Sequence, residues 1–214
     1  MALEGGDGAG KSTQLRLLAG ALIQREIPVL LTREPGGSEL GEQIRGLVLD
    51  PAHAPVDART EALLFAASRS AHVRRSIRPA LADGLVVVTD RYLDSSVAYQ
   101  GAGRRLGMQR IRELNLWAVE ELVPDLTVLL DVAEGTGRGR RADRSADRME
   151  LEPAAFHEQV RDAFLELARA APQRYLVLDA SAPVEELAGQ ILERVLALLG
   201  TRAAGADVGT GSRS

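Results

Sequence analysis

Hydrophobic residues in this chain fall into short continuous runs that alternate with longer stretches of helical spacing. The short runs predict buried β-strands at 2–4, 28–32, 85–89, 126–132 and 175–179. Apolar positions three or four residues apart predict helices at 12–25, 39–49, 57–82, 108–122, 153–171 and 184–199. This alternation is typical of an α/β domain, and the absence of tight hairpin turns between the runs favours parallel pairing. The pattern therefore predicts a five-stranded parallel sheet flanked by helices.

The pattern also predicts how the chain is organised. A length of 214 residues suits one domain with a full core, and we assign residues 1–200 to it. An arginine-rich segment follows the fourth predicted strand, and we expect a lid there at about 135–150. The alternative is a solvated helix face. Residues 201–214 are rich in Gly, Ala, Ser and Thr without apolar periodicity, which predicts a disordered tail.

Composition excludes several classes of partner. A net charge of −4 gives no reason to expect binding to nucleic acid or to a membrane surface. The chain has no cysteine, so it forms neither disulfides nor thiolate metal sites, and this composition is compatible with a reducing cytosol. Met1-Ala2-Leu3-Glu4 is neither basic nor part of a long apolar segment, so we expect no signal peptide or membrane span. We expect a cytoplasmic protein.

A glycine-rich segment follows the first predicted strand and contains the only lysine of the chain, Lys11. The segment fits the phosphate-binding pattern G-x-x-x-x-G-K-[ST]. Backbone N–H groups of such a loop surround the phosphates of ATP, while Lys11 would contact the β- and γ-phosphates and Ser12 would bind Mg²⁺. A chance glycine turn is the weaker alternative. The predicted ATP-binding residues are Gly5, Gly6, Asp7, Gly8, Ala9, Gly10, Lys11, Ser12 and Thr13.

Two further segments carry residues suited to phosphate chemistry. Asp90-Arg91-Tyr92 follows the strongest β-run, and ligands of open α/β sheets bind outside the carboxyl ends of strands. Asp90 would accept from Mg²⁺-bound water and Arg91 would bind a second phosphate, unless the pair is only a helix cap and a surface arginine. The arginines of the lid segment would neutralise charge during phosphoryl transfer.

A possible base-binding pair lies in the long helical stretch. Phe65 and Arg69 stand four residues apart, so they share one helix face. An aromatic ring can stack on a nucleobase while the guanidinium reads a carbonyl edge. The simpler alternative is that Phe65 belongs to the core. Asp7 is unusual in a phosphate loop, where it would hold an arginine, Mg²⁺ or a sugar hydroxyl, or face solvent.

Three segments together resemble the bacterial thymidylate kinase family. They are Glu4 to Gln14, Thr32-Arg33-Glu34-Pro35-Gly36-Gly37, and Asp90-Arg91-Tyr92 with Ser95-Ser96 and Tyr99-Gln100-Gly101. The resemblance covers residues 2–199. It implies a P-loop nucleoside monophosphate kinase fold with an arginine-rich lid, and transfer of the γ-phosphate of ATP to dTMP to give dTDP in dTTP biosynthesis. It also implies Mg²⁺ as cofactor and a homodimer.

The resemblance also implies roles for individual residues. Phe65 would stack on thymine, and Arg69 would donate to its O4 edge. Tyr99 would close the 2′ side of the sugar. Ser96 and Gln100 would lie at the base.

Other implied roles concern the sugar and the phosphates. Asp7 would hold the 3′-hydroxyl or order Arg91. Glu34 and Pro35 would lie near the acceptor phosphate, with a cis peptide between them, and Glu150 near the sugar or the metal. The lid would supply the catalytic arginine, for which Arg138, Arg141 and Arg148 are the candidates.

Two alternatives remain open from the sequence. One is a related kinase for another nucleotide or nucleoside, and the other is a nucleotide-binding regulatory ATPase. The base-binding pair and Arg91 argue against the second alternative, because a regulatory ATPase needs no second nucleotide pocket.

Overall fold

The computed structural model of the chain describes residues 1–132 and 147–207, with residues 201–207 described by their backbone only. Five strands form one sheet in the order β2-β3-β1-β4-β5, and each neighbouring pair is parallel, as predicted. The strands are β1 (Ala2–Gly5), β2 (Val29–Arg33), β3 (Val86–Asp90), β4 (Thr127–Asp131) and β5 (Tyr175–Asp179).

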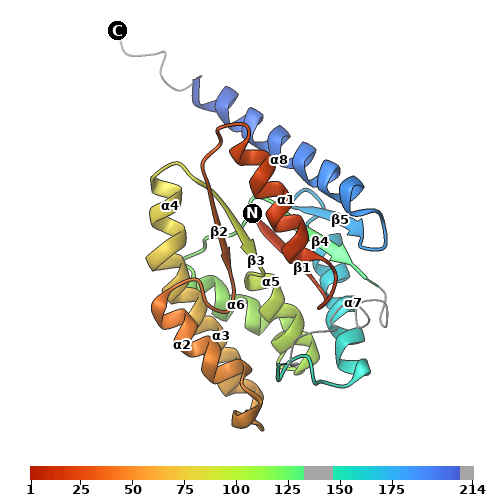
Figure 1. Cartoon of the computed structure of the whole chain (residues 1–214). Helices are drawn as coiled ribbons and strands as arrows, with labels where there is room; N and C mark the ends of the chain where they lie inside the picture. Colours follow the sequence, from red (N-terminus) through yellow and green to blue (C-terminus); the bar gives the residue numbers. More distant parts are fainter. Residues whose placement is uncertain (133–146, 208–214) are drawn as a thin grey trace.

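Helices cover both faces of this sheet, and α1 and α8 run side by side on one of them (Figure 1). The α-helices are α1 (Lys11–Ile23), α2 (Glu39–Leu49), α3 (Ala58–His72), α4 (Arg78–Ala82), α5 (Leu93–Ser96), α6 (Met108–Ala118), α7 (Ala154–Ala170) and α8 (Val184–Asp207). Shorter helical segments are the 3₁₀ turn η1 (Pro51–His53) and the π-helical segments η2 (Val73–Ile77) and η3 (Val97–Gly103). Among the described residues, no helix combines the length and apolar character needed to cross a bilayer.

The alternation of side chains along each strand creates a core on each face of the sheet. Val88, Val128 and Leu130 pack with the apolar residues of α1 and α8. Their neighbours Val87 and Leu129 face the opposite side, where they pack with residues of α4 and α7 respectively. Because successive side chains of a strand point to opposite faces, continuous apolar runs are what a sheet covered on both sides requires.

The helices differ from the predictions mainly in three regions. The segment predicted as one helix at 57–82 consists of α3, η2 and α4. Residues 93–103, for which the pattern predicted no helix, form α5 and η3. This segment buries polar as well as apolar side chains, Asp94 and Gln100 among them, so it shows no amphipathic period. At the end of the chain, α8 continues beyond 199 to Asp207, into the expected tail, where alanine favours helix.

The carboxyl ends of the strands meet at one edge of the sheet, and β1 lies at its centre. β1 ends at Gly5, whose φ of 133° lies in a region that favours glycine. A β-carbon at this position would lie only 2.3 Å from the carbonyl oxygen of Leu130 on β4. Gly5 thus lets the chain leave the sheet in close contact with β4, directly into the predicted phosphate loop.

Candidate active site

A cavity of about 1400 Å³ lies where β1, β2, β3 and β5 end. Pockets for one small ligand usually measure about 300–1,000 Å³. The volume therefore suits two nucleotides better than one. The phosphate-loop residues 7–14 line one part of it, and Phe65, Arg69, Ser96, Tyr99 and Gln100 line another.

The predicted phosphate loop joins β1 to α1. Gly10 caps the helix with a left-handed φ of 91°, and α1 begins at Lys11, so the N-terminal N–H groups of the helix belong to the loop. Lys11 Nζ donates to the carbonyl oxygens of Gly5 at 3.1 Å and Gly6 at 2.9 Å. Gly5 and Gly6 thus hold the lysine, whereas residues 7–13 line the cavity. Burial lowers the pKa of Lys11, and the charge of Arg91 adds to this effect.

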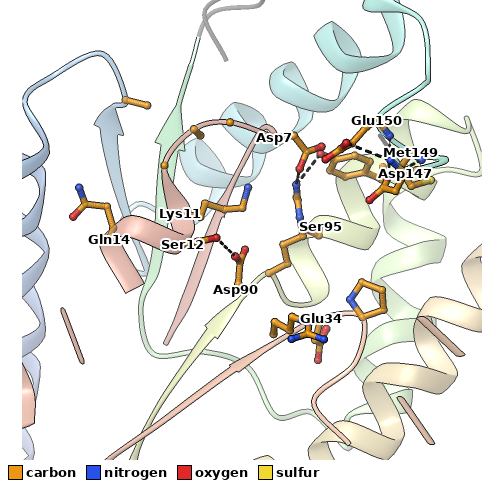
Figure 2. Close-up of a pocket in the computed structure, with 18 of the residues that line it drawn as sticks. Asp7, Lys11, Ser12, Gln14, Glu34, Asp90, Ser95, Asp147, Met149 and Glu150 are labelled. Atoms are coloured by element: carbon orange, nitrogen blue, oxygen red, sulfur yellow. Dashed lines mark hydrogen bonds and ion pairs between the residues drawn. The ribbon is translucent and has the colours of Figure 1, made fainter. Parts of the chain in front are cut away.

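Ser12 and Asp90, the predicted metal-binding residues, are brought together by the pairing of β1 with β3. The Ser12 hydroxyl donates to Oδ2 of Asp90 at 3.3 Å, as Figure 2 shows. Mg²⁺ is usually held by one or two protein oxygens together with waters and substrate phosphates, and this pair fits that pattern. In the described part of the chain, no cluster of three His, Cys, Asp or Glu residues is suited to hold a metal ion. The phosphates would therefore have to complete the coordination.

Arg91 contacts both the phosphate loop, through Asp7, and the other part of the cavity, through Tyr99. Its backbone is left-handed, with a φ of 68°, a strained conformation for a non-glycine residue and one that occurs often at functional sites. Nη2 donates to Asp7 Oδ1 at 2.8 Å, and Nη1 donates to Ser95 Oγ at 3.1 Å. The guanidinium also stacks over the ring of Tyr99, 5.0 Å from its centroid. Among the roles considered for Asp7, the contact that orders Arg91 is present.

Glu4, for which the sequence pattern predicted no role, supports this arrangement from β1. Its side chain is fully buried, and Oε1 accepts from the backbone N–H groups of Tyr92 at 2.8 Å and Ser95 at 3.3 Å. Oε2 accepts from the Ser95 hydroxyl at 2.6 Å, and Ser95 in turn contacts Arg91. Burial raises the pKa of Glu4 to about 7, while Arg91 acts in the opposite direction. The sequence signal that could have predicted this role is a glutamate within a buried apolar strand.

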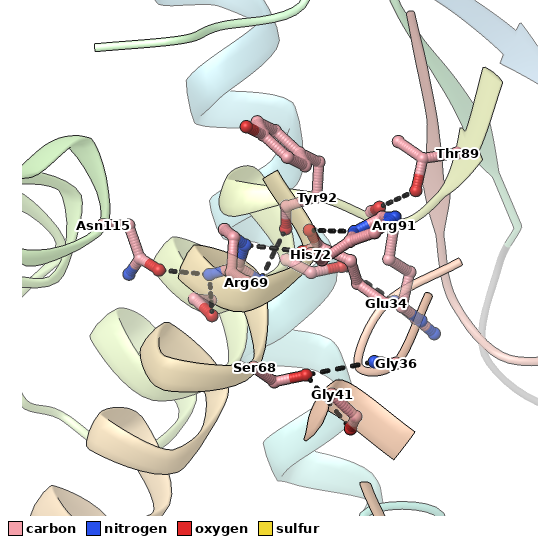
Figure 3. A network of polar contacts seen from close by, with 12 residues as sticks. Glu34, Gly36, Gly41, Ser68, Arg69, His72, Thr89, Arg91, Tyr92 and Asn115 are labelled. Atoms are coloured by element: carbon pink, nitrogen blue, oxygen red, sulfur yellow. Dashed lines mark hydrogen bonds and ion pairs between the residues drawn. The ribbon is translucent and has the colours of Figure 1, made fainter. Parts of the chain in front are cut away.

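Phe65 and Arg69 lie one turn apart on α3, and both line the cavity. The Arg69 guanidinium is almost fully buried and is fixed by an acceptor at each nitrogen (Figure 3). Its partners are Glu34 at Nε, Ser96 and Asn115 at Nη1, and the carbonyl oxygen of Tyr92 at Nη2. An arginine has five N–H donors. These contacts use four of the five, and among the described residues one N–H of Nη2 has no further acceptor.

The comparisons with known proteins agree with this arrangement. Residues 3–191 match the sequence profile of the family described as thymidylate kinase. The chain belongs to the thymidylate kinase family. It is 56% identical to thymidylate kinase of Clavibacter michiganensis over 207 residues, which cover 96% of each chain. It is 52% identical to thymidylate kinase of Cutibacterium acnes over 196 residues, which cover 92% of this chain and 95% of the other.

A solved structure of the family has the same fold. The crystal structure of thymidylate kinase from Ehrlichia chaffeensis superposes with a TM-score of 0.74 at 31% sequence identity. The match covers 91% of this chain and 96% of that one. The P-loop kinase fold that the resemblance implied is therefore confirmed.

Glu34 and Pro35 lie at the end of β2, and the peptide bond between them is cis, as the family resemblance implied. The carboxylate of Glu34 is nearly buried and bonds Arg69 through one oxygen and His72, at 3.0 Å, through the other. Glu34 thus fixes Arg69, and because Glu34 and Pro35 both line the cavity, their place near the acceptor phosphate stays a prediction. Arg45 of α2, which the sequence analysis missed, donates to the carbonyl oxygen of Pro35 at 2.8 Å and lines the cavity.

The remaining predicted residues divide into three groups. Glu150 lines the cavity together with Ser96, Tyr99 and Gln100. Arg138 and Arg141 lie outside the described residues. Arg148 does not line the cavity: Nη1 pairs with Glu61 at 2.7 Å and Nε donates to the carbonyl oxygen of Val48 at 2.9 Å. A buried carboxylate thus holds its guanidinium between α2 and α3, and its catalytic role stays a prediction from the sequence.

Proposed function

We infer that the chain is an ATP-dependent dTMP kinase, which forms dTDP for dTTP synthesis. The observation that carries this inference is one continuous cavity with the phosphate loop at one part and the Phe65 and Arg69 pair at another. Arg91 contacts both parts, through Tyr99 and through Asp7 of the loop itself. A donor triphosphate and an acceptor nucleotide bound there would meet at Arg91. The names of the relatives agree with this assignment.

The chemistry requires positioning and positive charge more than a base. The acceptor phosphate of dTMP is already anionic, so phosphoryl transfer needs no strong general base. Lys11 would contact the β- and γ-phosphates of ATP, and the left-handed backbone of Arg91 directs its guanidinium into the same cavity. Both cations would offset the repulsion between the two phosphate groups as they approach in line.

We propose that Mg²⁺ binds at Ser12 and Asp90. Their side-chain oxygens lie within hydrogen-bond distance of each other at the mouth of the phosphate loop. When bound, Mg²⁺ would neutralise charge on the transferred phosphate. Ser12 would contribute its hydroxyl oxygen, and Asp90 a carboxylate oxygen, directly or through water. The lid arginines Arg138 and Arg141 and a cytoplasmic location stay predictions from the sequence.

An assay of ADP release across monophosphate acceptors tests the assignment. We expect dTMP to give the highest kcat/KM, and we expect little ADP release without an acceptor. A faster reaction with AMP, dCMP or unphosphorylated thymidine would favour the related-kinase alternative. ADP release that does not depend on any acceptor would favour a regulatory ATPase.

We further propose a homodimer. The neighbouring helices α2, α3 and α6 expose large apolar side chains, which soluble monomers usually keep scattered. Leu47 of α2, Leu63 of α3 and Trp117 of α6 are 51%, 58% and 79% exposed. Light scattering should give twice the chain mass of 22.9 kDa, and Trp117→Glu should lower it. A wild-type mass of one chain would refute the proposal.

A further inference from the structure

Glu61 belongs to the same row of α3 as the base-binding pair, and its pairing with Arg148 is only one of its contacts. Glu61, Phe65 and Arg69 follow each other at intervals of four residues, so they share one helix face. Phe65 and Arg69 line the cavity, whereas Glu61 is fully buried behind it. A buried carboxylate is costly, so its contacts indicate what it does.

Four donors surround the Glu61 carboxylate. Oε1 accepts from Nε2 of Gln100 at 2.9 Å and from Nε of Arg104 at 3.1 Å. Oε2 accepts from Nη2 of Arg104 at 3.0 Å and pairs with Nη1 of Arg148 at 2.7 Å. A carboxylate held by two guanidinium groups offers acceptors only. The amide group that faces Glu61 must therefore be the NH₂ of Gln100 and not its oxygen.

This contact determines which end of Gln100 faces the ligand. Gln100 is 1% exposed, yet it lines the cavity together with Phe65 and Arg69. With Nε2 bound to Glu61, its Oε1 is the end left for the cavity, and no donor among the described residues bonds this oxygen. The site thus presents an acceptor from Gln100 beside a donor from Arg69.

We propose that Glu61 is a specificity-determining residue that makes the acceptor site prefer thymine and uracil to cytosine by locking the Gln100 amide. The proposal rests on the dTMP activity inferred above. Thymine carries an acceptor at O4 and an N–H donor at N3, which match Arg69 and Gln100. Cytosine carries an amino donor and an unprotonated N3 instead, so both contacts would fail. A site that hydrogen-bonds its substrate rejects an analogue strongly, because buried groups are left unpaired.

Glu61→Gln tests the proposal through substrate ratios. A glutamine at position 61 offers a donor as well as an acceptor, so the Gln100 amide can turn and present NH₂ to cytosine. We expect the ratio of kcat/KM for dTMP to kcat/KM for dCMP to fall at least about ten-fold, equivalent to about 1.4 kcal/mol. The ratio of dTMP to dUMP should stay unchanged, because both bases carry O4 and N3–H. A variant that folds less well loses the same fraction of active enzyme with every substrate, so this loss cancels in both ratios.

Two further variants distinguish locking of the Gln100 amide from a general effect of Glu61 on the structure around Arg104. Glu152→Gln removes another carboxylate partner of Arg104 without touching Gln100, and it should leave the dTMP to dCMP ratio at the wild-type value. Gln100→Leu should itself lower that ratio, and Glu61→Gln added to it should lower the ratio no further, because its effect passes through Gln100.

The outcomes distinguish the two inferences. A wild-type ratio in Glu61→Gln, an equal fall in Glu152→Gln, or a full further fall in the Gln100→Leu background would overturn the locking role. Absence of dTMP phosphorylation in the wild-type protein would instead overturn the proposed function.

Discussion

Replacing Glu4 by glutamine should change how the stability of this protein depends on pH. Glu4 is fully buried, and its two oxygens accept from the Tyr92 N–H and from the N–H and hydroxyl of Ser95. A glutamine of the same shape keeps the backbone contacts through its oxygen and can donate to the Ser95 hydroxyl through its NH₂. The substitution therefore removes the ionisable group while it retains the packing.

The magnitude follows from the pKa. Burial, with a smaller contribution from the charge of Asp94, raises the pKa of Glu4 from its ordinary value of 4.5 to about 7, against the effect of Arg91. The folded state then binds more protons than the unfolded state between these pH values, so stability falls as pH rises through this window. A shift of this size corresponds to roughly 3 kcal/mol, fully lost above pH 7.

Urea unfolding of the wild-type protein and Glu4→Gln at pH 5, 6, 7 and 8 measures the effect. We expect the free energy of unfolding of the variant, relative to the wild type, to rise between pH 5 and pH 8 by up to about 3 kcal/mol. Exposed Glu185 provides the control, since Glu185→Gln should show no such trend. A difference between wild type and Glu4→Gln that stays constant over this pH range would refute the reasoning.

Two predictions concern the substrates. Lys11→Arg should lose most of its turnover although the charge is kept. Nζ is buried within 3.1 Å of two loop carbonyl oxygens, where a planar guanidinium does not fit. A near-normal kcat of the variant would count against this explanation. Phe65→Ala should raise the KM for dTMP by about 5- to 150-fold if stacking contributes about 1–3 kcal/mol, with the KM for ATP unchanged. An equal rise in both KM values would mean that Phe65 serves the core alone.

Local features of the sequence were enough for most of the fold. The central strands β1, β3 and β4 are mostly buried, so they are almost continuously apolar. The edge strands β2 and β5 are partly exposed but still form short apolar runs, and the long helices show their apolar spacing in the sequence. Residues 93–103 failed this test because they are helical but buried on all sides, with Asp94 and Gln100 among them. These polar side chains can be buried because they are hydrogen-bonded: Asp94 accepts from the Tyr175 hydroxyl at 2.7 Å, and Gln100 donates to Glu61.

Some residues of the candidate site were likewise predictable from local spacing, and others were not. Lys11, Ser12 and the glycines around them lie in one loop, so their spacing alone predicted a phosphate site. Arg148 lies within the predicted lid at 135–150, but only the folded chain revealed that it pairs with Glu61 and does not line the cavity.

Most strands and helices, the phosphate loop and the family thus followed from local patterns, because each depends on residues close together in the chain. The tertiary structure decided how the site residues are held. Pairing of Leu3 with Asp90 in the sheet brings Glu4 to Ser95 and so to Arg91, although they are far apart in sequence. Helix packing likewise brings Glu61 to Gln100. No local pattern encodes such contacts, because burial and strand register arise only when the whole sheet and its helices assemble.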